Sequence, residues 1–140
     1  MKVTYNLDFL KPNLLFGIKL NALFMIYKSI EHRLPISFEE FSEALQDWET
    51  IPLMQNNRLI GGVIVKGNEL HVGYAEKPAA SIRKNIKEVM QPLLEKHGFV
   101  VTKVAKDNIN GLIFCKRLGF VEFGSDSDKI LLKCNGSHYV

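Results

Sequence analysis

Apolar residues recur at helical spacing in three long stretches of the chain, residues 14–30, 38–47 and 81–97. The first stretch is apolar on more than one face, which exceeds what covering a single sheet requires. Ser37 and Glu40, at the start of the second stretch, have the spacing of a capping box. The pattern therefore predicts three helices, of which the first has more apolar surface than packing on one sheet would bury.

Runs of apolar and β-branched residues between these helices predict strands. Asn56-Asn57 and Gly67-Asn68 separate three such runs and predict two tight turns. The third helix then acts as a crossover, which predicts that the strands before and after it are parallel. The predicted strands are residues 3–6, 51–54, 59–65, 69–74, 99–104, 120–123 and 129–133.

A fourth, short helix is predicted near the C-terminus, where residues 108–120 read NINGLIFCKRLGF. Asn108 is a favourable N-cap, and Gly119 suits the left-handed exit of a helix. This segment resembles the signature of the GNAT superfamily of acyl-CoA-dependent N-acyltransferases, in which an Asn precedes a helix that ends in Tyr-x-x-x-Gly-Phe. Cys115 stands at the position of the family tyrosine.

The predicted order β-α-α-β-β-β-α-β-α-β-β is the GNAT order and covers nearly the whole chain. The resemblance implies an α/β (α+β) fold in one domain, residues 1–140, with a mixed, mostly antiparallel sheet of six or seven strands and four flanking helices. It also implies diverging strands that leave a cleft near Gly73 and Asn108. Divergent GNAT-like proteins of this size occur in bacteriophages, and this chain resembles them too.

The resemblance implies acetyl-CoA as co-substrate, with its pyrophosphate bound by a loop of the pattern Arg/Gln-x-x-Gly-x-Gly. Lys77 falls at the first position of this loop, whereas Ala80 and Ile82 replace the two glycines. Pro78 removes one amide donor, so an ordinary helix start that binds no ligand remains the alternative. The residues implied to bind the cofactor are Val72, Gly73, Tyr74, Lys77, Ala79, Ala80, Ser81, Ile82, Arg83, Asn108 and Cys115.

Acetyl transfer requires a base for the acceptor amine and commonly an acid for the leaving thiolate. Alternation places Glu69 and His71 on one face of the strand before the loop, where some GNAT members carry a catalytic Glu. Two side chains that only face solvent are the alternative. Cys115 is the candidate acid, although a cysteine on a helix often serves as a small apolar residue.

Composition and charge argue against several other classes of protein. The chain has 140 residues, 46% of them hydrophobic, and a net charge of +3 without a run of basic residues, which argues against nucleic-acid binding. The first helix is interrupted by charge and is too short to span a membrane. Two cysteines without disulfide spacing indicate a reducing cytoplasm. No histidine or cysteine spacing predicts a metal site.

Three readings of function remain open. The first is an N-acetyltransferase that transfers the acetyl group to a small-molecule or protein amine by direct attack. The second is a catalytically inactive GNAT-fold binding or structural protein. The third is an unrelated α/β interaction module. The apolar surface of residues 14–30, at Phe16, Phe24 and Tyr27, additionally predicts a homodimer or another partner chain.

Overall fold

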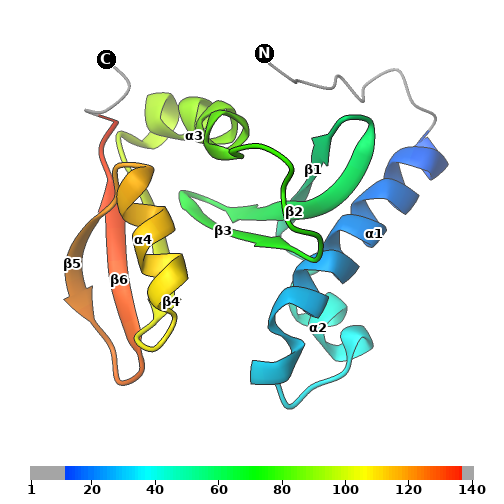
Figure 1. Ribbon diagram of the computed structural model, residues 1–140, viewed down its shortest axis with the longest axis horizontal. Helices are drawn as coiled ribbons and strands as arrows, with labels where there is room; N and C mark the ends of the chain where they lie inside the picture. Colours follow the sequence, from blue (N-terminus) through cyan, green and yellow to red (C-terminus); the bar gives the residue numbers. More distant parts are fainter. Residues whose placement is uncertain (1–11, 137–140) are drawn as a thin grey trace. The chain divides into compact units, whose positions relative to one another are not determined.

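The computed structural model of the chain describes residues 12–136. Its helices and strands follow the predicted order from the first helix onward (Figure 1). The strand predicted at residues 3–6 lies outside the described residues. The elements are α1 (Pro12–Ile30), the short 3₁₀ helix η1 (Glu31–Arg33), α2 (Phe38–Ala44), β1 (Glu49–Gln55), β2 (Arg58–Lys66), β3 (Glu69–Tyr74), α3 (Arg83–His97), β4 (Val100–Ala105), α4 (Ile109–Arg117), β5 (Val121–Ser125) and β6 (Lys129–Cys134).

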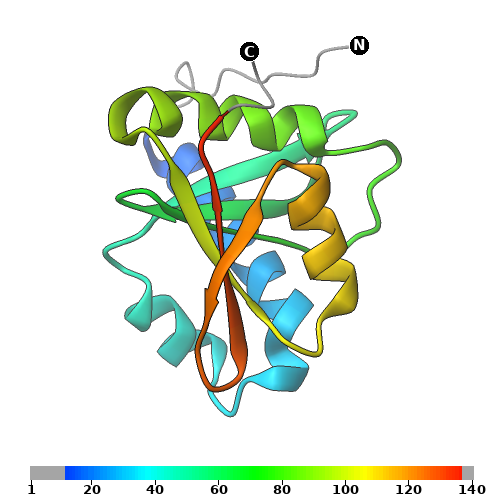
Figure 2. The same ribbon diagram turned by 90° about the vertical axis from the view of Figure 1, so that its left-hand side faces the viewer.

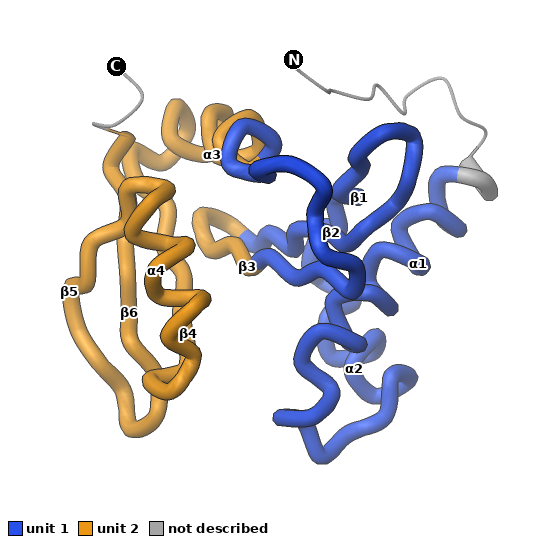
Figure 3. Tube along the Cα trace, viewed as in Figure 1, with its two compact units in different colours: residues 1–66, 72–85 blue, residues 67–71, 86–140 orange. Residues whose placement is uncertain are grey.

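The six strands form one sheet in the order β1-β2-β3-β4-β6-β5. The β3–β4 pair is parallel, whereas β1–β2, β4–β6 and β5–β6 are antiparallel. This confirms the predicted mixed, mostly antiparallel sheet with four α-helices. The chain divides into two compact units, one with the chain up to Lys66 and Val72–Asn85, the other with Gly67–His71 and the chain from Ile86 (Figure 3). Strand β3 contributes to both.

In the first unit, the hairpin of β1 and β2 turns at Asn56 and Asn57. Both have positive φ (52° and 63°), the conformation that a two-residue type I′ hairpin turn requires and that Asn tolerates. Helix α1 packs against both strands. Its buried Leu23 and Ile26 meet Ile64 of β2, and this contact buries the core face of the hairpin.

Helix α2 begins at the predicted capping box. The Ser37 hydroxyl accepts a hydrogen bond from the Glu40 amide at 3.2 Å, and the Glu40 carboxylate accepts one from the Ser37 amide at 3.2 Å. The helix ends at Ala44 instead of the predicted Asp47. The reason is that the following amides bond three residues back, as Trp48 does to the carbonyl of Leu45, so the last turns tighten and leave the α-helical path.

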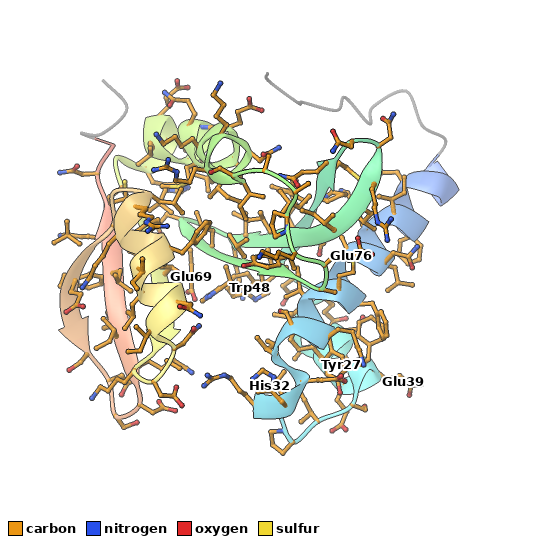
Figure 4. The ribbon with its side chains drawn as sticks, in the orientation of Figure 1. Tyr27, His32, Glu39, Trp48, Glu69 and Glu76 are labelled. Atoms are coloured by element: carbon orange, nitrogen blue, oxygen red, sulfur yellow. The ribbon has the colours of Figure 1, made fainter. Side chains whose placement is uncertain are left out.

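The predicted partner surface on α1 has two kinds of side chain. Tyr27, labelled in Figure 4, donates its hydroxyl to the carbonyl oxygen of Ile36 at 2.7 Å and packs its ring on Phe38, so it is engaged within the chain. Phe16 and Phe24 are 67% and 44% exposed. Dimerisation through this helix stays a prediction, and these two phenylalanines are its remaining candidates.

In the second unit, β4, β6 and β5 lie side by side (Figure 2). Val100 is paired with Cys134 and Thr102 with Leu132, and all four side chains are buried. Because alternate residues of a strand point to opposite faces, these pairs define the core face of this part of the sheet. Strands β5 and β6 pair antiparallel, with Val121 opposite Lys133, which confirms the terminal pair that the sequence predicted.

The crossover prediction is also confirmed. Strands β3 and β4, joined by α3, pair in parallel at Glu69 and Val101. The Val101 amide donates to the carbonyl oxygen of Asn68 at 2.9 Å, which continues the contact into the turn before β3. Within the described residues the registered parallel pairing comprises this single residue pair. The predicted cleft near Gly73 and Asn108 stays a prediction.

Helix α3 begins at Arg83, two residues later than predicted. The Ser81 hydroxyl accepts a hydrogen bond from the Arg83 amide at 3.3 Å, and a serine that bonds backbone in this way favours a helix start over a helix interior. Gly98 follows the helix with φ of +83°, the left-handed conformation in which glycine commonly ends a helix. No helix of residues 12–136 is long and apolar enough to cross a membrane.

Candidate functional site

The two candidate bases on β3 are in direct contact. Nε2 of His71 lies 2.7 Å from a carboxylate oxygen of Glu69, and both side chains are partly buried. This confirms that they share one face of the strand. A carboxylate that orients a histidine is the arrangement that proton-transfer sites need.

The next residues of β3, Val72–Tyr74, are among those that the resemblance implies to bind acetyl-CoA. In this stretch Gly73 is buried, and a Cβ on it would lie 2.7 Å from Oγ of Ser29 in α1. A Cβ on Gly61 of β2 would lie 2.2 Å from the carbonyl oxygen of Gly73. Position 61 therefore requires glycine, because the backbone of β3 lies against it, whereas a side chain at position 73 would require the Ser29 hydroxyl and Ile26 to shift.

The loop after β3 is attached to the β1–β2 hairpin by Gln55, the last residue of β1. Its Oε1 accepts a hydrogen bond from the Ala79 amide at 2.9 Å, and its Nε2 donates to the carbonyl oxygen of Ala80 at 2.9 Å. The Gln55 side chain is buried although Ala79 and Ala80 are exposed. Nothing in the sequence around Gln55 indicated these two bonds.

A second attachment joins the start of the same loop to β2. The Arg58 guanidinium donates two hydrogen bonds to the Glu76 carboxylate, with Nε to Oε2 at 2.6 Å and Nη2 to Oε1 at 2.7 Å. The hydrogen bond from Arg58 lowers the pKa of Glu76 below its ordinary value. A carboxylate that is paired in this way is a poorer base, so Glu69 and His71 remain the base candidates. Figure 4 labels both Glu69 and Glu76.

Whether the loop after β3 fits a pyrophosphate depends on which of its backbone amides can donate a hydrogen bond to it. Pro78 has no amide hydrogen, the Ala79 amide is bonded to Gln55, and the Arg83 amide is bonded to Ser81. Ile82, where the family has glycine, is buried. The amides of residues 80–82 remain, at the start of a 15-residue helix whose dipole favours anions.

Positively charged side chains surround the loop at the start of α3. Lys77, Arg83 and Lys84 are all exposed around the loop. Positive side chains and helix-terminal amides together suit an anionic phosphate group. The residues present therefore fit a pyrophosphate, with fewer backbone donors than the loop pattern of the GNAT signature would offer.

Asn108 caps helix α4 as predicted. Its Oδ1 accepts a hydrogen bond from the Gly111 amide at 3.0 Å. A Cβ on Gly111 would lie 2.5 Å from Nδ2 of Asn108, so the glycine leaves space for the cap. The capping role is thus established, and contact with the pantetheine arm stays a prediction.

Cys115 is buried on α4, with 9% of its surface exposed. Burial raises the pKa of its thiol from 9.0 to about 11, because the thiolate would lose its hydration. A protonated, buried thiol packs as a small apolar side chain. This environment favours the core role over the acid role that the resemblance implied.

The raised pKa predicts a loss of stability at alkaline pH. Between about pH 9 and 11 the unfolded chain ionises Cys115 while the folded chain does not, so the folded state loses stability as pH rises. The loss is on the order of 2 kcal/mol at its full extent. Urea titrations at pH 8 and pH 10.5 should show a smaller pH effect in Cys115→Ala than in the unchanged chain. An equal effect in both proteins would contradict the assignment.

The described residues contain no group of three or more His, Cys, Asp or Glu side chains that could hold a metal ion. Both cysteines are free and buried.

The site residues that the sequence analysis missed are Gln55, Arg58 and Gly61. A polar residue at a strand end, beside the Asn56-Asn57 turn, is typical of an exposed position, so the chain carries no local signal for Gln55.

Neither the models of known protein families nor the curated proteins contain a match to this chain. Solved structures do match it. N-acetyltransferase PseH of Campylobacter jejuni, in complex with acetyl coenzyme A, has a TM-score of 0.61 and 15% identity and covers 95% of this chain and 97% of its own. A spermidine N-acetyltransferase SpeG variant from Vibrio cholerae has a TM-score of 0.66 and 18% identity, with coverage of 86% and 94%.

Ribosomal-protein-alanine N-acetyltransferase of Brucella melitensis has a TM-score of 0.62 and 14% identity, with coverage of 82% of this chain and 93% of its own. Matches at this level of identity demonstrate a shared fold, and the whole length of each neighbour is nearly covered. The chain therefore has the GNAT fold, the fold of these N-acetyltransferases.

Proposed function

We propose that the protein is an N-acetyltransferase that transfers an acetyl group from acetyl-CoA to a primary amine by direct attack. The observation that carries the proposal is the 2.7 Å contact between Glu69 and His71, on the strand that continues into Val72–Tyr74. It supplies an oriented base beside the backbone that the GNAT resemblance assigns to the thioester. The fold shared with N-acetyltransferases supports the same reaction class.

In this proposal the amine nitrogen attacks the thioester carbonyl carbon and forms the new amide bond. The C–S bond breaks, and the sulfur leaves with the bonding electrons. The His71 imidazole accepts the amine proton, which passes to the CoA thiolate, so that the products are the amide and the free thiol. Glu69 holds the imidazole in place through its 2.7 Å contact with Nε2.

The co-substrate proposal rests on the loop and on two neighbours. PseH is described with acetyl coenzyme A, and PaiA N-acetyltransferase of Thermoplasma acidophilum is described with coenzyme A. The exposed Lys77, Arg83 and Lys84 would bind the pyrophosphate. Both cysteines are free, which fits a reducing compartment, and we extend the proposal to the cytoplasm on that basis.

Calorimetry with acetyl-CoA tests the proposal. We expect saturable binding, weaker than a loop with both family glycines would give, and release of free thiol when small-molecule amines or peptides are added. Thermal-shift screening of other acyl-CoA donors selects the donor for the amine screen. Absence of binding at millimolar acetyl-CoA, with the protein folded, would contradict the proposal.

The second candidate is a GNAT-fold protein without catalysis. Ile82 buried in place of a loop glycine and Cys115 buried in place of the family tyrosine favour it. Binding of acetyl-CoA without thiol release across a broad amine panel would support this candidate. A dependence of thiol release on His71 would exclude it.

A further inference from the structure

The side-chain amide of Gln55 forms two hydrogen bonds with the loop that follows β3. Its oxygen accepts from the Ala79 amide, and its nitrogen donates to the carbonyl oxygen of Ala80, each at 2.9 Å. The side chain is only 8% exposed. A buried amide with a missing partner is costly, so these two bonds tie the position of Gln55 to one conformation of the loop.

The loop needs such an attachment. Ala79 and Ala80 are exposed and have only a methyl side chain, so they contribute little packing of their own. Arg58 holds the loop at Glu76, and the buried Ile82 holds it just before α3. Gln55 acts between these two points and bonds the backbone of two consecutive residues, Ala79 and Ala80.

We propose that Gln55 is the positioning residue of the pyrophosphate loop, an inference that rests on the proposed function. In the family pattern, two glycines let the loop backbone adopt its shape and approach the phosphates. This chain has Ala80 and Ile82 there, and the Gln55 amide sets the conformation by bonding Ala79 and Ala80. The amides of residues 80–82 are thereby ordered before the ligand arrives, which lowers the entropic cost of binding it.

This role predicts an effect limited to donors that carry the pyrophosphate. Gln55→Met keeps the length and volume of the side chain but removes both hydrogen bonds. We expect KM for acetyl-CoA to rise about tenfold, as the loss of roughly 1.4 kcal/mol would give, with kcat changed less than about threefold. S-acetylpantetheine, which lacks the pyrophosphate and the nucleotide, should react with unchanged kcat/KM.

Gln55→Glu provides a second variant of nearly the same shape. It can accept from the Ala79 amide but cannot donate to the Ala80 carbonyl oxygen, and it adds a negative charge beside the loop. KM for acetyl-CoA should rise at least as much as in Gln55→Met. Gln46→Ala, at an exposed position after α2, is the matched control and should leave both donors unaffected.

Hydrogen exchange of the unliganded protein provides a second measurement. The Ala79 amide should exchange at least about tenfold faster in Gln55→Met, because its acceptor is gone. Should Gln55→Met fail to fold in a thermal melt, Gln55→Glu decides the kinetic comparison. Unchanged KM for acetyl-CoA, or an equal loss with both donors, would overturn the inference. Unchanged protein that neither binds nor uses acetyl-CoA would instead overturn the proposed function, and the inference with it.

Discussion

The His71→Ala variant should lose acetyl transfer by about 100- to 1,000-fold in kcat, because removal of a positioned base typically costs that much. KM for acetyl-CoA should change little, since the pyrophosphate loop is not altered. Glu69→Gln should cost less, because the amide oxygen of the glutamine can still accept a hydrogen bond from His71. Initial rates of thiol release at saturating amine measure both effects.

Two controls separate this role from a general disturbance of the strand. His32→Ala removes an exposed histidine of η1, and Glu49→Gln neutralises an exposed carboxylate of β1. Both should retain the rate of the unchanged protein. A His71→Ala protein that is folded, binds acetyl-CoA and keeps more than about a third of the rate would exclude His71 as the base.

The Ala80→Asp variant should lose acetyl-CoA binding by more than about 100-fold, through repulsion between a carboxylate and the phosphates in a partly desolvated site. Ala80 is exposed, so the unliganded protein should tolerate the side chain. Ala80→Asn has nearly the same shape without the charge and should bind more tightly than Ala80→Asp. Calorimetry on both variants separates bulk from charge.

A negative charge introduced far from the loop in the sequence is the control for the change in net charge. Gln46→Asp changes the charge of the protein equally, at an exposed turn, and should bind acetyl-CoA like the unchanged protein. Equal affinity of Ala80→Asp and the unchanged protein would remove the loop from the binding site. It would leave the Glu69–His71 pair as the only part of the proposal still supported.

Several features were predictable because their causes are local. The Ser37–Glu40 capping box, the Asn56-Asn57 turn and the Asn108 cap each depend on residues within three positions of one another. The contact of Glu69 with His71 follows in the same way from the alternation of side chains along a strand. The parallel pairing of β3 and β4 followed from the length of the crossover helix between them.

The missed features involve residues far apart in the chain. Gln55 bonds Ala79, 24 positions away, and Arg58 pairs with Glu76, 18 positions away. Nothing in the neighbourhood of either residue distinguishes it from an exposed polar side chain of a hairpin. The requirement for glycine at position 61 likewise arises from the backbone of β3 and not from a turn.

The sequence by itself determined the order of the helices and strands, that Glu69 and His71 share one face of β3, and that Cys115 stands at the position of the tyrosine in the GNAT signature. It did so because helix caps, tight turns and strand alternation act over a few residues. Only the tertiary structure decided that Gln55 and Arg58 hold the loop after β3, that Ile82 is buried and that Cys115 is desolvated. These properties depend on which distant segments are brought into contact, because burial and hydrogen-bond partners are created only when the chain folds.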